Sequence, residues 1–309
     1  MTATDYDTVG DAQESGAVAT LRADESVEGV FACTRKERQI SRSGAPYLTV
    51  ELRDRSGSIV GRAFRDADRL ASRFERGDVV RVRGRVERFR DELQIGVQEI
   101  ERAGDADPAR FLPAAYRDVD ELDGFLEHLA REVYDAPLRQ LLDAVLGDAA
   151  LRGELRRAPC SVPAAPGRAG AGHHAYLGGL LEHTVAVATL AIEVCAVHAK
   201  LDRDLLLAAA LVHDLGRARE FRYGAEITLS REGAMVGHIE LSLREIAAHA
   251  PATLAGERRL ALEHCVLLHH GSDAAAGRRF QSAEALALHR INALDAGVKG
   301  ALERGLPSG

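Results

Sequence analysis

An adjacent histidine and aspartate follow a strongly apolar segment, at a position where two ionisable side chains are not expected to be buried without a partner. His213 and Asp214 directly follow eight apolar residues, Leu205 to Val212, a run too apolar for a solvated helix face. Burying an imidazole and a carboxylate at the end of such a helix is costly unless a charged partner satisfies them. A divalent cation is a suitable partner, because imidazole and carboxylate together bind Mn, Fe, Co, Ni or Zn.

Other helical patterns direct similar side chains toward a core. His183 shares a helix face with Leu180 and Val187, a face expected to be buried. The remaining polar residues of this kind are His238, His269, His270, Asn292 and Asp295. One such histidine is usually a core residue with a satisfied hydrogen bond. Five segments that each direct His, Asp or Asn inward are hard to explain by structure alone, and they predict a metal site.

The histidines also divide the chain. All twelve lie at or after His128, and residues 27–102 show a different pattern, with apolar and polar residues alternating as in half-buried strands. Five strand patterns, with one short helix after the third, predict a small OB-type barrel. We therefore expect a disordered acidic tail at 1–26, the barrel at 27–102, a linker at 103–116 and an all-α domain at 117–309.

The expected barrel is basic in an acidic molecule. It holds 17 basic and 13 acidic residues, a net charge of +4, whereas the whole chain carries −7. An outward row of arginines could follow a phosphate backbone: Arg81, Arg83, Arg85, Arg88 and Arg90. Tyr47, Phe31, Phe64 and Phe89 are candidate platforms for stacked bases. The alternative is a solvated strand face over an aromatic core, and the residues alone leave both interpretations open.

Composition narrows the class of protein. No apolar run approaches 18 residues, so we expect no transmembrane helix and no membrane partner. The first 26 residues lack the hydrophobic segment of a signal peptide. The four cysteines are scattered without CxxC spacing, which favours reduced thiols in a cytoplasmic protein. The sequence leaves the oligomeric state open, a homo-oligomer included.

Several blocks of sequence carry a resemblance to a known family. They are "PYLTVELRDRSGSI", "HHAYLGGLLEHT", "LVHDLGRARE", "GHIELS", "LLHHG" and "EALALHRINALDA", in that order. Together they resemble the YhaM-type 3′-5′ exoribonucleases, which join an N-terminal OB fold to a C-terminal HD domain, a metal-dependent phosphohydrolase. Two positions depart from the HD pattern. Arg217 stands where Lys is usual, and Asn292 stands where the final Asp ligand falls, with Asp295 one turn further on.

The resemblance implies a two-metal mechanism. His183, His213 and Asp214, with Asn292 or Asp295, would hold one ion, and Asp214 would bridge to a second ion on His238 and His269 or His270. Such ions, with Mn expected before Co, Fe, Ni or Zn, would activate a water for attack on the scissile phosphate. Arg217 would stabilise charge on phosphoryl oxygens. His173 and His174 would donate to the phosphate or the leaving oxygen, or have no role.

The expected activity is metal-dependent 3′-5′ hydrolysis of single-stranded RNA or DNA held by the barrel. Two alternatives stay open. One is an HD phosphohydrolase of nucleotides or cyclic dinucleotides. The other is a nucleic-acid-binding relative whose catalysis is weakened by the amide at Asn292.

Overall fold

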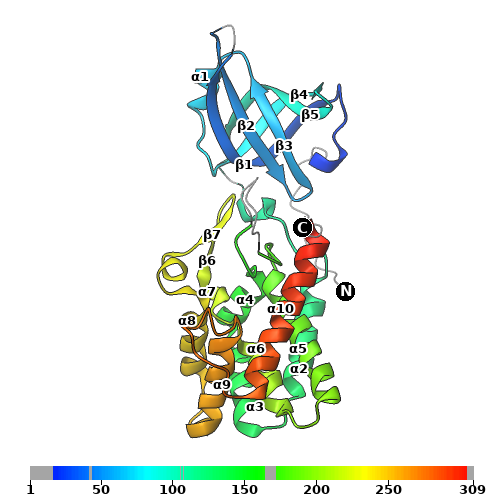
Figure 1. Cartoon of the computed structure of the whole chain (residues 1–309). Helices are drawn as coiled ribbons and strands as arrows, with labels where there is room; N and C mark the ends of the chain where they lie inside the picture. Colours follow the sequence, from blue (N-terminus) through cyan, green and yellow to red (C-terminus); the bar gives the residue numbers. More distant parts are fainter. Residues whose placement is uncertain (1–16, 42–43, 105, 107, 164–171, 305–309) are drawn as a thin grey trace, which may run out of the picture. The chain divides into compact units, whose positions relative to one another are not determined.

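The computed structural model describes residues 17–41, 44–104, 106, 108–163 and 172–304, and it divides the chain into two compact units (Figure 1). The first unit contains residues up to Pro113 together with Tyr223–Glu226, and the second contains Ala114–Arg222 and the residues from Ile227 onward. The first is a β-barrel and the second is helical, which confirms the predicted fold class.

The first unit is a five-stranded closed barrel. Its strands, in the spatial order β1-β2-β3-β5-β4, are β1 (Ser26–Ile40), β2 (Pro46–Asp54), β3 (Gly57–Ala63), β4 (Val79–Phe89) and β5 (Glu92–Arg102). A short helix, α1 (Ala67–Ala71), follows the third strand as the sequence predicts. All neighbouring strands pair antiparallel except β3 and β5, which pair in parallel, and the pairing of β1 with β4 closes the barrel.

The barrel core follows from alternation along the strands. Leu48, Val50 and Leu52 on β2 are buried, whereas the residues between them lie on the outer face. A short 3-10 turn, η1 (Val18–Thr20), precedes the barrel, and the Val18 amide donates to Asp54 Oδ2 at 2.7 Å. Residues 17–25 thus differ from the disordered tail expected at these positions. Residues 1–16 of that tail lie outside the described part of the chain.

The second unit is built from helices. Its elements are α2 (Val119–Arg131), α3 (Ala136–Gly147), α4 (Ala149–Arg157), α5 (Gly179–Val197), α6 (Arg203–Val212), α7 (Arg217–Glu220), α8 (Arg231–His249), α9 (Gly256–Leu268) and α10 (Ala283–Arg304). A small hairpin of β6 (Phe221–Tyr223) and β7 (Ile227–Leu229) joins α7 to α8. A 3-10 turn, η2 (Pro108–Phe111), lies in the stretch expected to be a linker.

The helical core surrounds α5 and α6. Every residue from Leu205 to Val212 is buried. The helix α6 is enclosed by other helices, and this explains why all of its faces are apolar. The α5 helix is long and apolar enough to cross a membrane by length and composition, although the sequence analysis expected no such segment. Half of that window is buried inside the unit, and α5 packs on α2, α6 and α10 as a core helix does.

Candidate metal centre

Two histidines of the site are fixed by the ends of their helices. His213 follows the last residue of α6, and His269 follows the last residue of α9. Carbonyl groups in the final turn of a helix lack intrahelical partners. His213 Nδ1 donates to the Ala210 carbonyl at 2.8 Å, and His269 Nδ1 donates to the Val266 carbonyl at 2.6 Å. With the proton on Nδ1, each Nε2 has a free lone pair, the form in which imidazole binds metal.

Asp214 lies at the centre of the converging imidazoles. Its Oδ2 is 3.6 Å from His213 Nε2 and 3.9 Å from His183 Nε2. On the other side, its Oδ1 is 3.4 Å from His269 Nε2 and 3.5 Å from His238 Nε2. The two carboxylate oxygens therefore face two different groups of nitrogen atoms.

These donors form two sets that share Asp214. The first set contains His183, His213 and Asp214, and the second contains Asp214, His238, His269 and His270. Within each set, one donor atom from every residue lies within 4.8 Å of the donor atoms of the others. The sequence analysis left open whether His269 or His270 belongs to the site, and the structure brings both there. Nε2 of His238 and Nε2 of His270 are 2.9 Å apart.

A kink and a glycine place His238. The chain leaves helical geometry at Gly237, where φ is 74°, and resumes the helix at His238. Gly216 lies against this turn, and a Cβ on it would come within 2.1 Å of the His238 carbonyl oxygen. Its amide donates to Ser242 Oγ at 2.8 Å. Glycine at 216 therefore lets α8 approach the end of α6 closely enough for His238 to reach Asp214.

Three buried polar atoms in this centre have no hydrogen-bond partner among the described residues. They are Asp214 Oδ1, His269 Nε2 and Asn292 Oδ1. Unpartnered polar atoms inside a protein are rare because each carries an uncompensated desolvation cost. All three are of atom types that bind divalent cations, so the donor set fits a bound metal.

Burial keeps the nitrogen donors neutral. It lowers the pKa of His213 to about 3 and that of His270 to about 2, so both are free of a competing proton near neutral pH. Burial acts to raise the pKa of Asp214, but the Arg217 guanidinium and the neighbouring histidines outweigh it and hold that pKa well below its usual range. Asp214 is therefore ionised, and the centre carries one central negative charge.

Arg217 is the buried counter-charge of Asp214. Its Nε donates to Asp214 Oδ2 and its Nη1 donates to Glu220 Oε2, both at 2.9 Å. Its Nη2 lies 3.4 Å from His238 Nε2. Glu220 was not among the residues predicted for the site, although it lies one turn after Arg217 in the same sequence block. Arginine supports this arrangement because its planar fork serves two carboxylates at once.

Asp295 and His174 lie on the far edge of His183. Asp295 Oδ2 is 2.7 Å from His183 Nδ1 and 3.0 Å from His174 Nε2. His174 is 1% exposed, and its other nitrogen is 3.0 Å from the Tyr176 hydroxyl. With both ring nitrogens occupied, His174 is not placed to donate to a phosphate, so of the two alternatives left by the sequence the donor role is the less favoured.

His173 remains near the centre with a free nitrogen. Its ring packs edge-on against His183 with centroids 4.9 Å apart, and its Nε2 is buried without a partner among the described residues. Burial lowers its pKa to about 3. Cys160 is a neighbour that the sequence did not indicate, since its Sγ lies within 4.8 Å of donor atoms on both His173 and His183.

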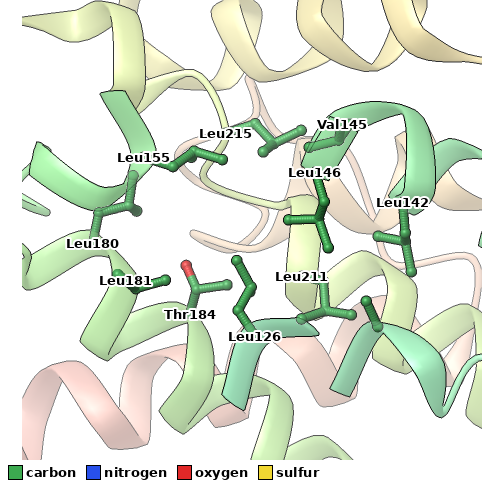
Figure 2. Close-up of a pocket in the computed structure, with 11 residues that line it drawn as sticks. Leu126, Leu142, Val145, Leu146, Leu155, Leu180, Leu181, Thr184, Leu211 and Leu215 are labelled. Carbon is green, nitrogen blue, oxygen red and sulfur yellow. The ribbon is translucent and has the colours of Figure 1, made fainter. Parts of the chain in front are cut away.

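A separate pocket in the helical unit does not contain this chemistry. Figure 2 shows leucine and valine side chains from α2, α3, α4, α5 and α6 around it, with the Thr184 hydroxyl as the polar group among those drawn. Leu180 and Leu181 precede His183 on α5, and Leu211 and Leu215 flank His213 and Asp214. The pocket is thus a packing gap on the apolar side of the two helices that carry the metal-site residues.

The barrel arginines face outward as the sequence predicts, but they do not form an uncompensated basic row. Arg81, Arg83 and Arg85 are exposed along β4, but acidic residues accompany them. Arg83 pairs with Glu28 at 3.5 Å and with Glu99 at 3.6 Å, Arg85 with Asp24 at 3.9 Å, and Arg81 stands opposite Glu101. Nearby carboxylates reduce the positive potential that would attract a phosphate backbone.

Aromatic and basic side chains gather instead at the ends of β2, β3 and β4. Tyr47 and Phe64 stack with ring centroids 5.3 Å apart, and Phe64 is 59% exposed. Arg62 and Arg90 lie over the Phe89 ring at 5.2 and 5.3 Å from its centroid. Arg88 precedes Phe89 and is exposed. Phe31 is 2% exposed and belongs to the core, so it is no platform for a base.

Comparison with known proteins agrees with both units. Residues 30–103 match the OB-fold nucleic acid binding domain, and residues 180–297 match the HD domain. The 3′-5′ exoribonuclease YhaM of Shouchella clausii (strain KSM-K16) is 28% identical over 298 residues, which cover 93% of this chain and 89% of that protein. YhaM of Bacillus velezensis is also 28% identical, over 88% of this chain and 85% of its own length. The chain is thus similar to YhaM-type exoribonucleases over most of its length.

The HD-domain match covers most residues of the centre. Those from His183 to Asp295 fall inside the HD match, while His173 and His174 precede it. Tyr47 and the arginines of β4 fall inside the OB-fold match. An HD domain with these His and Asp sets indicates use of divalent metal.

Proposed function

We propose that the protein is a metal-dependent 3′-5′ exoribonuclease that degrades single-stranded RNA. The observation that carries this proposal is the pair of donor sets sharing Asp214, together with the unpartnered ligand atoms inside them. The curated relatives, which align along nearly their whole length, are named 3′-5′ exoribonucleases.

We infer two divalent ions, with Mn²⁺ expected first and Co, Fe, Ni or Zn as alternatives. His183, His213 and Asp214 would hold one, with the Asn292 amide oxygen as a neutral fourth ligand. Asp214, His238, His269 and His270 would hold the other. Ions bound in this way supply Lewis acidity and a bound water of lowered pKa.

Side chains around the centre can stabilise charge on the phosphate, bond to substrate oxygens and exclude bulk water. Arg217, fixed between Asp214 and Glu220, brings a permanent positive charge to the centre, where it can stabilise negative charge developing on a phosphate. His173 is neutral because burial lowers its pKa to about 3, and its buried Nε2 is free to bond a substrate oxygen or a water. The enclosing helices keep bulk water away from His183, His213 and His269, whose side chains are fully buried.

We propose that RNA lies on an aromatic and basic surface of the barrel made of Tyr47, Phe64, Arg62, Phe89 and Arg90. Stacked and exposed rings offer faces to unpaired bases, and the arginines offer charge to the backbone. The arginines at 81, 83 and 85 contribute less, because carboxylates surround them.

The test is hydrolysis of a single-stranded RNA labelled at either end, with Mn²⁺ and with chelator. We expect 5′-labelled RNA to shorten progressively and 3′-labelled RNA to release its label at once as a mononucleotide, with both reactions lost in chelator and in Asp214→Asn. A DNA strand of the same sequence measures the preference for RNA. Hydrolysis of nucleotides or cyclic dinucleotides in place of RNA, or RNA binding without cleavage at saturating metal, would refute the proposal.

We also propose a cytoplasmic location. The four cysteines are free and buried, as reduced thiols in a reducing compartment are. Fractionation of the native host would test this, with recovery in a membrane or secreted fraction as the contrary result.

A further inference from the structure

We propose that Asp295 is a positioning residue that fixes the orientation of His183, and that His174 and Tyr176 hold Asp295 in place. The inference rests on the metal centre of the proposed function, and it assigns to Asp295 a role other than that of metal ligand.

The two nitrogens of His183 face opposite sides of its ring. Nδ1 lies 2.7 Å from Asp295 Oδ2, whereas Nε2 lies 3.2 Å from His213 Nε2 and 3.9 Å from Asp214 Oδ2. A neutral imidazole carries one proton. A hydrogen bond to Asp295 places that proton on Nδ1 and leaves the lone pair of Nε2 facing His213 and Asp214. Carboxylates that accept from a ligating histidine in this way set its tautomer and its orientation.

Asp295 also belongs to a different cluster of donor atoms from Asp214, the carboxylate at the centre. Asp295 has its donor oxygen within 4.8 Å of donor atoms on His174 and His183. Asp214 has its own within the same distance of donor atoms on His183 and His213. No group among the described residues contains both aspartates. His183 thus stands between Asp295 and the rest of the centre, and the unpartnered Asn292 Oδ1 is the acceptor left for the metal.

A chain of hydrogen bonds continues outward from Asp295. His174 Nε2 is 3.0 Å from Asp295 Oδ2, and His174 Nδ1 is 3.0 Å from the Tyr176 hydroxyl. Tyr176 donates its own proton to Glu182 Oε2 at 2.7 Å, so its oxygen accepts from His174. His174 then donates through both nitrogens as the imidazolium; burial acts to lower its pKa, but its hydrogen bonds with Asp295 and Glu182 raise that pKa above its usual value. Lys299 donates to the other oxygen of Glu182 at 3.0 Å. Each member of the chain therefore has a fixed partner on both sides.

The backbone conformation of His174 fixes its place in this series of hydrogen bonds. Its φ is 49°, in the left-handed region that a residue with a side chain rarely adopts. Gly179 lies directly behind it, and a Cβ there would come within 2.2 Å of the His174 carbonyl oxygen. The start of α5, which carries His183, and the loop that carries His174 are thus packed against one another.

Substitutions at Asp295 distinguish positioning from ligation. Both hydrogen bonds end on the same oxygen, Oδ2, so the amide oxygen of Asp295→Asn can accept both, while Asp295→Ala can accept neither. Loss of a group that accepts a hydrogen bond from a ligating histidine costs about 10–100-fold in metal affinity. We expect that loss in Asp295→Ala and at most a few-fold loss in Asp295→Asn, measured by Mn²⁺ titration of the metal-free protein.

A second readout requires neither metal nor RNA. Proton NMR of the metal-free protein should show a downfield imidazole N–H signal from His183, present in Asp295→Asn and absent in Asp295→Ala. Tyr176→Phe removes the outer bond without touching Asp295, and we expect it to weaken metal binding by a few-fold. The matched control is Asp123→Asn, which alters a buried aspartate bound by Arg152 and Arg156 and should leave metal affinity unchanged.

Equal losses of metal affinity in Asp295→Asn and Asp295→Ala would overturn the proposal, because a charged ligand cannot be replaced by an amide without cost. If Asp295→Ala does not fold, the Mn²⁺ affinities of Asp295→Asn and Tyr176→Phe still distinguish the two roles. A loss of affinity in Asp295→Asn that is tenfold larger than the loss in Tyr176→Phe indicates that Asp295 is a metal ligand. If these results hold but RNA is not cleaved, only the proposed activity fails.

Discussion

The ion pair between Arg217 and Asp214 yields a quantitative prediction. Arg217→Met keeps the length and volume of the side chain but leaves Asp214 and Glu220 without their shared cation. Both carboxylates are buried, with side chains 2% and 8% exposed. Breaking a buried pair by removing one partner costs about 3–5 kcal/mol. A unit of this size loses about 2–4 °C of melting temperature per kcal/mol, so we expect a fall of about 6–20 °C in chelator.

Divalent metal should reverse much of this loss. Ions held by Asp214 supply the positive charge that the guanidinium no longer provides, so the metal-dependent rise in melting temperature should be larger in the variant than in the parent. The assay is thermal unfolding of both proteins in chelator and in saturating Mn²⁺. Ligand binding to the folded state raises stability in proportion to the logarithm of its concentration, which a titration of Mn²⁺ verifies.

Arg152→Met is the matched control. Arg152 likewise bonds two carboxylates, Asp123 and Glu127, but lies away from the metal centre. Its loss should destabilise the protein equally with and without metal. If Arg217→Met behaves like Arg152→Met, with no extra rescue by Mn²⁺, the argument that metal and guanidinium share the charge of Asp214 is refuted.

Three further results are expected. Asn292→Asp should tighten metal binding by at least about tenfold in a Mn²⁺ titration, because a charged oxygen replaces a neutral one; an unchanged affinity would exclude position 292 from the site. Gly216→Ala should cost about 1–3 kcal/mol in denaturant unfolding, since the new Cβ meets the His238 carbonyl, whereas Gly124→Ala, with open space around it, should not destabilise. The Glu182 pKa is lowered to about 2 despite burial, so its contribution to stability is present above about pH 4.5 and lost toward pH 2. Melting curves of Glu182→Gln should therefore vary less across that range than those of the parent, and equal slopes would contradict the shift.

Much of the fold followed from local patterns in the sequence. Alternating residues such as Val80 and Val82 specify strands with one buried face, and the order of five strands with one helix specified the barrel. The apolar run that ends at His213 specified a buried helix with polar groups at its end. These signals are local, because the periodicity of a strand or a helix is written into neighbouring residues.

Most residues that the structure brings together in the candidate metal centre were named from the sequence, but their arrangement was not. That His183, His213 and Asp214 meet depends on how α5 and α6 pack, and no spacing along the chain fixes that geometry. The sequence placed the final ligand position at Asn292, with Asp295 three residues further along the helix as the alternative. The structure places Asp295 against His183 and His174, and leaves the buried amide oxygen of Asn292 without a partner.

Tertiary structure also decided which surface of the barrel could bind nucleic acid. Alternation placed Arg83 and Arg85 on an outer face, but the acids beside them come from β1, β5 and the segment before β1. The Tyr47 and Phe64 pair arises only when β2 and β3 align in register. The sequence by itself determined where the strands and helices lie and that alternate residues of a barrel strand such as β4 face the core. Only the packing of distant elements determined which charges are compensated and which remain free, because electrostatic and hydrogen-bond partners meet in space rather than along the chain.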